Sequence, residues 1–380
     1  MLYKYGSIQE FQSQQSEYPT KKGAKLKDNE GSKRPPGPIQ LNRQTIALPY
    51  TGLHTFMRTP YCMTPEDLSA GEIEVAICGV PWDGTQITRS GSHAGPLGIR
   101  LADYSPSPLQ GALHQSVRVD PFKELRVADY GDSEIYVGDT MRTFSAVTKF
   151  ISEIAGTGAK PFILGGDHGI TWPNVTGLAE VHGYGRIGVV HFDAHADTAP
   201  DMMGVLASHG TPMRRLIESG AVKGKNFVQI GLRGYWPDPP VLAWMEEQGM
   251  RTHFMAEIEK RGFDAVLEDA VNEAMENVDH LFLSVDVDVA DPAYAPGTGS
   301  PEPGGLTSRE LLRAVRRLSA EVGIVGMDVV EVAPVMDSGN SITALLASRC
   351  VLEALTGTAM RKLGITSPDY LDDRASNGPN

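Results

Sequence analysis

The stretch that decides the fold is IGVVHFDAHAD, residues 187–197, in which an apolar run leads directly into acidic and imidazole side chains. An apolar run of this length is typical of a buried strand. Side chains alternate between the two faces of a strand, so Asp193, His195 and Asp197 could point into one space at its carboxyl end. Three such groups in one space repel one another and lose hydration unless a cation lies among them. The stretch therefore predicts a metal site rather than a solvated acidic loop.

Two further segments repeat this arrangement. Residues 162–169, FILGGDHG, run from an apolar stretch through two glycines to His168. Residues 281–288, LFLSVDVD, end in Asp286 and Asp288, which share one face of the predicted strand. In open α/β sheets, ligands bind outside the carboxyl ends of the strands. Three strand ends would thus offer two histidines and four aspartates to one crevice.

The composition of this ligand set indicates which metals it would hold. Six ligands rich in carboxylate oxygen exceed one tetrahedral zinc site, whereas manganese suits such coordination and nickel accepts the same ligands. Two ions bridged by shared carboxylates, roughly 3.5–4 Å apart, would use all six groups and hold a hydroxide. Two divalent ions, four aspartates and a hydroxide sum to a charge of about −1. Such a centre would tolerate a cationic substrate better than a phosphate ester.

Four motifs give this pattern a family resemblance. GGDH at 165–168, DAHAD at 193–197, SVDVDVADP at 284–292 and GMDVVEVAP at 326–334 resemble the signature segments of the ureohydrolase family, the arginase–agmatinase group. They occur in the family's order, within a resemblance that runs from about Ile73 to Leu355. The resemblance implies that one metal is held by His168, Asp193, Asp197 and Asp286, and the other by Asp193, His195, Asp286 and Asp288. Asp193 and Asp286 would bridge the two.

The chemistry of that family is hydrolysis of a guanidino C–N bond, which releases urea and an amine or ammonia. By resemblance, Glu331 would hold the guanidinium NH₂ groups in a bidentate contact. His209 would pass a proton to the leaving nitrogen, and Asp197 joins them as a candidate catalytic residue as well as a metal ligand. Asp167 and His191 adjoin the ligands in sequence and are expected to orient them.

The substrate is less clearly indicated. Residues 201–210 lack the arginase loop that binds the α-amino and carboxylate groups of arginine, and are closer to the agmatinase branch. Loop 231–240, segment 90–96 and the N-terminal extension look similar to the guanidine hydrolase branch, which is associated with nickel. We therefore expect hydrolysis of free guanidine or a small alkylated guanidine or biguanide. The candidate pocket residues are Tyr235, Trp236, Thr85 and Trp172, with a cation–π contact expected from the first two.

Two alternatives remain open. The chain could act on a longer ω-guanidino substrate, as an agmatinase or guanidinobutyrase does. It could also be an inactive metal-binding subunit that scaffolds a hetero-oligomer. The complete ligand set argues against the second, because an inactive copy would not need every one of these groups.

The arrangement of the chain favours one large α/β domain with extensions. We expect a mobile polar tail over 1–38, an extension over 39–72 that packs on the core or on a neighbouring subunit, a catalytic domain over 73–360 and a tail over 361–380. Alternating runs predict a three-layer α/β/α fold with a mostly parallel, doubly wound sheet. The expected strands are 73–80, 161–165, 187–193, 227–231, 281–287 and 324–330. The expected helices include 144–156, 211–219, 239–249, 264–277, 308–319 and 341–356, and Thr64-Pro65-Glu66-Asp67 is a capped helix start.

Composition excludes several classes of partner. The net charge of −13 argues against nucleic acid. No run of 18 apolar residues is found in the sequence, so no membrane span is expected, and the N-terminus lacks a secretory apolar region. Three widely spaced cysteines indicate reduced thiols and a cytoplasmic location. The remaining partners are a small cationic guanidino substrate and, by resemblance, further copies of the chain in a trimer or hexamer.

Overall fold

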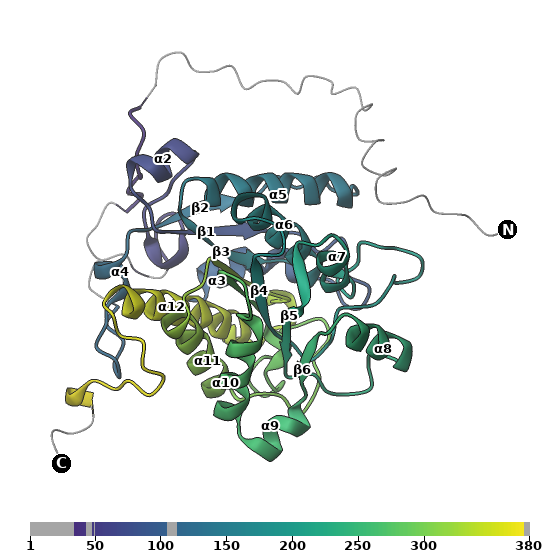
Figure 1. The fold of residues 1–380 in the computed structure, drawn as a ribbon. Coiled ribbons are helices and arrows are strands. Elements are labelled where there is room, and N and C mark those ends of the chain that lie inside the picture. Colours follow the sequence, from purple (N-terminus) through teal and green to yellow (C-terminus); the bar gives the residue numbers. More distant parts are fainter. Residues whose placement is uncertain (1–33, 43–47, 49, 105–111, 376–380) are drawn as a thin grey trace. The chain divides into compact units, whose positions relative to one another are not determined.

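The computed structural model describes residues 34–42, 48, 50–104 and 112–375 (Figure 1). The chain divides into two units, Met1–Pro36 and Gly37–Asn380, and the fold described below is that of the second. Most of the tail predicted for residues 1–38 therefore lies outside the described residues.

The described residues form one sheet of eight parallel strands in the order β2-β1-β3-β8-β7-β4-β5-β6. This arrangement confirms the predicted fold class. The strands are β1 (Val75–Val80), β2 (Val127–Asp132), β3 (Lys160–Gly165), β4 (Ile187–Phe192), β5 (Val222–Ile230), β6 (Arg251–His253), β7 (His280–Asp286) and β8 (Gly326–Val330).

Helices cover both faces of the sheet, because strands buried on both sides need an apolar layer on each. Residues of one hydrophobic cluster come from α2 (Pro65–Ala70), α5 (Thr140–Gly156), α6 (Thr171–His182), α7 (Pro212–Glu218) and α8 (Pro239–Glu247). Residues of the other come from α3 (Gly95–Leu101), α9 (Met255–Arg261), α10 (Phe263–Ala274), α11 (Ser308–Glu321) and α12 (Ile342–Lys362). Shorter elements are α4 (Pro121–Glu124), η2 (Phe56–Arg58), η3 (Ser92–Ala94), η5 (His168–Ile170), η6 (Val287–Val289), η7 (Pro334–Met336) and η8 (Asp373–Ala375).

Each expected strand and helix is present, although β5 begins five residues earlier and α12 ends six residues later than predicted. Strands β2 and β6 and helices α3, α4, α6 and α9 were not expected. Strand β2 carries a buried acid, Asp129, which an apolar pattern does not anticipate; Arg100 of α3 balances it with bonds of 2.8 and 2.9 Å. Strand β6 has only three residues. Helix α6 contains Pro173 and Gly177, which normally weaken a helix. Gly177 is needed there because a Cβ would lie 2.6 Å from the carbonyl oxygen of Thr148 in α5.

Helix α12 is long and apolar enough to cross a membrane by length and composition alone. In the structure, however, 72% of its most apolar window is buried. The helix packs chiefly on α11 and belongs to the hydrophobic core.

The segment before β1 lies along the β2 edge of the sheet. Ile39 and Tyr61 form an antiparallel bridge, and Tyr61 also bridges to Asp129. The amide of Phe56 donates to the Asp129 carboxylate at 2.7 Å, and the Phe56 ring is buried. Contact of this segment with a neighbouring subunit stays a prediction.

The strand order brings the predicted motifs together. Strands β3, β8, β7 and β4 are successive neighbours in the middle of the sheet, although they are third, eighth, seventh and fourth in the chain. All of them run parallel, so the residues at their carboxyl ends meet at one edge.

Candidate metal centre

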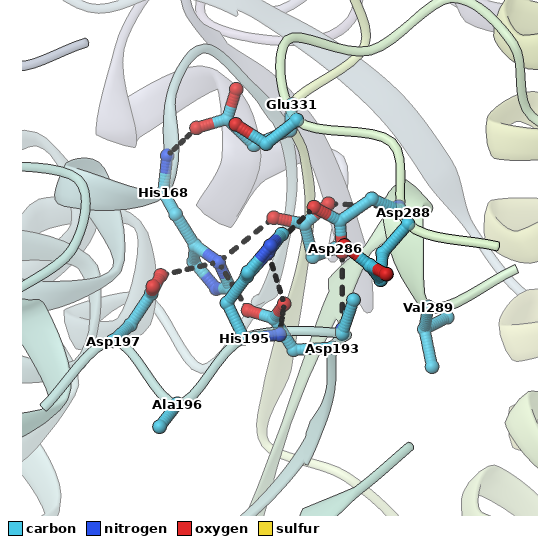
Figure 2. A network of polar contacts seen from close by, with 12 residues as sticks. His168, Asp193, His195, Ala196, Asp197, Asp286, Asp288, Val289 and Glu331 are labelled. Atoms are coloured by element: carbon cyan, nitrogen blue, oxygen red, sulfur yellow. Dashed lines mark hydrogen bonds and ion pairs between the residues drawn. The ribbon is translucent and has the colours of Figure 1, made fainter. Parts of the chain in front are cut away.

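The predicted ligands converge at this edge (Figure 2). Two groups of side chains offer ligand atoms that lie within 4.8 Å of one another. The first consists of His168, His191, Asp193 and Asp197, and the second of Asp193, His195 and Asp288. Asp286, at the end of β7, is not in either group, but its Oδ2 lies 3.1 Å from Nδ1 of His168. All six residues that sequence reasoning nominated are thus in one cluster, and Asp193 belongs to both groups.

His168 is the centre of the first group. Its Nδ1 lies 3.0 Å from Asp193 Oδ2, 3.1 Å from Asp197 Oδ2 and 3.1 Å from Asp286 Oδ2. One ring nitrogen carries at most one proton, so it cannot bond to three carboxylates at once. Three carboxylate oxygens and one imidazole nitrogen around a shared space are the donor set of a cation.

The hydrogen bond of the other ring nitrogen of His168, Nε2, determines where one ring proton lies. Ser284 donates its hydroxyl proton to Asp328 at 2.7 Å, so its oxygen is free to accept a proton from His168 Nε2, 3.0 Å away. Asp328 is itself held by Thr171 and Asn174 at 2.7 and 3.0 Å. Burial opposes a charged ring, but Asp193, Asp197 and Asp286 raise the pKa of His168 well above its usual value, so Nδ1 also holds a proton without a metal. A metal would replace that proton while Ser284 keeps the one on Nε2, as in a metal-binding histidine.

His191 lies close to the first group but has a different role. The Gln229 side-chain amide donates to His191 Nδ1 at 3.1 Å and to the Ala196 carbonyl at 2.7 Å. His191 Nε2 must therefore carry the proton, which it donates to Asp193 Oδ2 at 2.8 Å. His191 orients the shared carboxylate, as the sequence predicted, and offers no lone pair to a metal.

The second group lies beside the first. His195 Nδ1 is 3.0 Å from Asp288 Oδ2 and 3.6 Å from Asp193 Oδ1. Backbone amides hold the carboxylates: Ala194 donates to Asp288 at 3.1 Å, and Asp288 donates to Asp286 at 2.9 Å. Amide donors of this kind fix the oxygens before any ligand binds.

The pKa shifts show that the cluster has excess negative charge. Burial and the neighbouring carboxylates of Asp288 and Asp193 raise the pKa of Asp286 well above its usual value. Burial and Asp193 likewise raise the pKa of Asp288 to about 6. Burial alone would lower the pKa of His195, but Asp288 and Asp193 raise it to about 12. Asp286 and His195 therefore hold protons at neutral pH when no other cation is present, and divalent ions would replace those protons.

The donor chemistry therefore fits two divalent ions. The resemblance assigns His168, Asp193, Asp197 and Asp286 to one and Asp193, His195, Asp286 and Asp288 to the other. The positions of the side chains agree with that division, because Asp193 turns one oxygen toward each histidine.

Glu331 lies next to the cluster, one residue after β8 (Figure 2). Its Oε1 accepts the backbone amide of His168 at 2.9 Å and is 3.4 Å from His209 Nδ1. Its Oε2 accepts Gln86 Nε2 at 2.7 Å. A carboxylate has about four lone-pair sites; two of these accept hydrogen bonds, and His209 Nδ1 lies close to a third. The bidentate guanidinium contact that the resemblance implied would therefore require His209 to move away from Oε1.

Asp197 and Glu331 share a further property. Both have positive φ values, 52° and 62°, in the left-handed region that disfavours residues with a Cβ. Such conformations persist where the surroundings determine them, and they cluster at functional sites. This backbone geometry directs the Asp197 carboxylate toward His168 Nδ1 and the Glu331 carboxylate toward the His168 amide.

Asp167 and His209 border Glu331. Asp167 accepts the amide and hydroxyl of Thr85 at 2.9 and 2.7 Å, and this fixes the loop that carries Gln86. Burial and the Glu331 charge raise the pKa of Asp167 to about 7. Burial opposes protonation of His209, but its contact with Glu331 raises its pKa above the ordinary value. His209 is thus suited to hold a proton beside Glu331.

The other pocket candidates are farther from these contacts. Thr85 is buried and occupied by Asp167. The side chains of Tyr235 and Trp236 are 93% and 71% exposed, so they do not close a pocket in this arrangement of the chain. Trp172 packs edge to face on Phe144, with ring centroids 5.8 Å apart. A pocket role for Tyr235, Trp236 or Trp172 stays a prediction.

Sequence reasoning missed several residues that support the site. Four such residues come from other strands or loops. Gln86 contacts Glu331, and Ser284 contacts the ligand His168. Gln229 contacts His191, and Asp328 contacts Ser284. Ser284 and Asp328 lie inside quoted motifs, where a polar residue within an apolar strand is a usable signal. Gln229 gives the same signal within the expected strand 227–231, whereas Gln86 lies in a loop and gives none.

Arg233 was also missed, and it joins three segments around the second group. Its guanidinium donates to the carbonyls of Asp288 at 2.7 Å, Val289 at 3.1 Å and Pro303 at 3.0 Å. Desolvation lowers its pKa, against the attraction of nearby carboxylates. Arg233 thereby ties loop 231–240 to the end of β7 and to loop 296–305.

Known proteins resemble this chain over most of its length. A model of the Arginase family matches residues 73–357. Guanidinopropionase from Pseudomonas aeruginosa is 38% identical, over 80% of this chain and 92% of that protein. The structure is similar to proclavaminate amidino hydrolase from Streptomyces clavuligerus, with a TM-score of 0.74, 33% identity and coverage of 83% of this chain and 100% of that one. It also resembles a Trypanosoma cruzi formiminoglutamase variant with Mn²⁺, with a TM-score of 0.68, 25% identity and coverage of 76% and 94%.

Proposed function

Because this chain belongs to the arginase family of metal-dependent amidine hydrolases, we propose that it hydrolyses free guanidine or a small alkylated guanidine or biguanide. Guanidinium and water would give urea and ammonium. An alkylated guanidinium and water would give either urea and an alkylammonium ion or an alkylurea and ammonium. The observation that carries this proposal is the set of contacts around Glu331. Two hydrogen bonds and the His209 imidazole, 3.4 Å away, already surround its carboxylate, which favours a small cation that needs few hydrogen bonds from the site.

The proposed cofactor is a pair of divalent ions, nickel or manganese, on the six ligands described above. Such ions lower the pKa of water and so supply a nucleophile near neutral pH. The protein's own part is to bind and orient the cation. Glu331 would accept guanidinium N–H groups, with the remaining Oε2 lone pair available at once and the His209 position available when that ring turns aside.

His209 and Asp197 are the proposed proton-handling groups. His209 carries a raised pKa next to Glu331, so it can hold a proton and give it to the nitrogen that leaves. Asp197 is aimed at the same space by its left-handed backbone conformation. Protonation of the departing nitrogen is essential because a neutral amine leaves far more easily than an amide anion.

The wall beside Glu331 supports a small substrate. The Gln86 carbonyl oxygen accepts the Thr88 hydroxyl at 2.9 Å, which orients the amide so that its NH₂ faces Glu331. The Thr88 hydroxyl is 2.9 Å from that of Ser300, so this contact links the β1 loop to loop 296–305. Arg89 Nε donates to the Gly299 carbonyl at 2.9 Å and reinforces the same wall.

The proposal is tested by urea release from guanidine, dimethylguanidine, metformin, agmatine and guanidinobutyrate, with protein loaded separately with nickel and manganese. We expect the highest kcat/KM on guanidine or a dimethylated relative. A kcat/KM for agmatine far above that for guanidine would overturn the small-substrate proposal and leave the family assignment intact.

A second candidate substrate is a guanidino acid, and Arg89 favours it. Only one of the Arg89 side-chain donor atoms, Nε, has a described hydrogen bond, and the residue is exposed near loop 296–305. The guanidinium can still offer further N–H groups to a substrate carboxylate. Guanidinobutyrate turnover that falls in Arg89→Met, with guanidine turnover unchanged, would support this candidate.

We also propose a cytoplasmic homo-oligomer, a trimer or hexamer. The three cysteines are buried free thiols, in keeping with a reducing compartment. Size-exclusion chromatography with light scattering measures the number of chains, and a monomer would contradict the proposal.

A further inference from the structure

A surface cavity of about 550 Å³ lies at the end of the sheet opposite the metal centre. Lys160, the first residue of β3, lines it, whereas His168 follows the other end of that strand. A strand of this length places the two about 20 Å apart. The cavity's other charged lining residues are Glu72, Glu74, Arg361 and Lys362.

The acidic residues of the cavity already have basic partners. Lys362 Nζ lies 2.8 and 2.9 Å from the two carboxylate oxygens of Glu74. Glu74 also accepts the backbone amide of Arg126 at 3.0 Å. Glu72 is 3.7 Å from the guanidinium of Arg126. These charges cancel in pairs.

Two cations in the cavity wall are left without a carboxylate partner. The ammonium of Lys160 makes no hydrogen bond or ion pair to any residue that the structure describes. Arg361 donates Nη1 to the carbonyls of Ala320 and Glu321 at 3.2 and 2.8 Å, and within the described ranges it has no ion pair. Burial and the Arg361 charge lower the pKa of Lys160. Lys160 is partly buried and Arg361 is exposed, and a partly buried cation that is repelled by a second positive charge leaves a need for an anion.

We propose that this cavity binds a phosphate group between the Lys160 ammonium and the Arg361 guanidinium. A phosphate monoester carries about −1.5 to −2 charge at neutral pH, which matches the two unpaired cations. The free N–H groups of an arginine pair with two phosphate oxygens, and a lysine contributes a point charge.

The size and walls of the cavity indicate room for more than the anion. A volume of about 550 Å³ is within the range of small-molecule sites. Ile73 and Leu125 supply apolar wall beside the charged end. Inorganic phosphate and a phosphate ester share the chemistry that this site recognises, and a direct comparison separates them.

The test measures binding of inorganic phosphate and of AMP to the metal-loaded enzyme at constant ionic strength, by calorimetry and by the rise in Tm. The variants are Lys160→Met, which removes the charge and keeps the length, and Lys160→Arg, which restores a cation. Lys149→Met, an exposed lysine of α5, is the matched control. A Met at 160 also removes an unpaired charge, so this variant is expected to fold at least as stably as the wild type without phosphate.

We expect Lys160→Met to weaken binding of the preferred probe at least about tenfold. Lys149→Met should bind that probe as tightly as the wild type, and Lys160→Arg should bind it more tightly than Lys160→Met. Tighter binding of AMP would assign the site to a phosphate ester, and tighter inorganic phosphate to the free anion. Binding that is equal in wild type and Lys160→Met would place the anion elsewhere, for example at the metals, and overturn the proposal. Absence of binding for both probes in the millimolar range would do the same. Neither result depends on which guanidino compound is the substrate.

Discussion

Replacing Ser284 by alanine tests the idea that the Asp328–Ser284–His168 chain prepares His168 for a metal. The change removes the oxygen that accepts the His168 Nε2 proton at 3.0 Å, in a place where all three side chains are fully buried. Without this acceptor, no hydrogen bond holds the proton on Nε2. A proton on Nδ1 would occupy the nitrogen that faces Asp193, Asp197 and Asp286.

The magnitude follows from the buried donor. A buried donor left without a partner costs about 1–3 kcal/mol. At about 1.4 kcal/mol for each factor of ten, this weakens metal binding by about 5-fold to 140-fold. Loss of an outer hydrogen-bond partner generally weakens metal binding by about 10- to 100-fold, which is consistent with this range.

The assay is the dissociation constant of manganese and of nickel, measured by competition with a chelator at fixed pH. Ser319→Ala is the control, because Ser319 is equally buried and its hydroxyl donates to the Val315 carbonyl at 2.8 Å in α11. We expect weaker metal binding only in Ser284→Ala, with kcat largely recovered at saturating metal. Metal dissociation constants within twofold of wild type in Ser284→Ala would refute the argument.

Three further predictions concern other parts of the chain. Asp193→Asn removes the carboxylate shared by both ligand groups, so kcat/KM should fall more than about 100-fold, which exceeds the effect of losing an outer hydrogen-bond partner. Mass spectrometry should also find less metal per chain. Near-normal turnover would contradict a two-metal centre. Gln86→Met removes the Glu331 Oε2 donor at 2.7 Å, so the ratio of agmatine to guanidine kcat/KM should rise; an unchanged ratio with a lower Tm would make Gln86 merely structural. Burial lowers the pKa of both His182 and His280, whose rings lie 4.5 Å apart. Below about pH 6.5 the unfolded chain therefore binds more protons and stability falls, so His182→Gln should lose less Tm than wild type between pH 7.5 and 5.5 in calorimetry.

The elements that sequence analysis located are those whose signal is local. The apolar runs before Asp193 and Asp286 are strands because a buried parallel strand has a continuous apolar pattern. The elements that it missed owe their stability to distant groups. Strand β2 tolerates Asp129 only because Arg100 lies beside it, and α6 tolerates Gly177 only because α5 packs closely there.

The same distinction divides the site. The motifs identified the six candidate ligands, because short spacing at a strand end places side chains on one face whatever the rest of the fold. They did not identify the partners that set protonation and orientation. Gln229 reaches His191 across neighbouring strands, and Ser284 reaches His168 across 116 positions of the sequence.

The sequence by itself determined the chemical nature of this protein: buried parallel strands that end in carboxylates and imidazoles, and therefore a cation site in an α/β fold. Those features depend on residues a few positions apart, which alternation along a strand controls. Only the tertiary structure decided that β3, β8, β7 and β4 are neighbours, and that Gln86 meets Glu331 although 245 positions separate them. Strand order and loop contacts result from packing of the whole chain, which a local pattern does not encode.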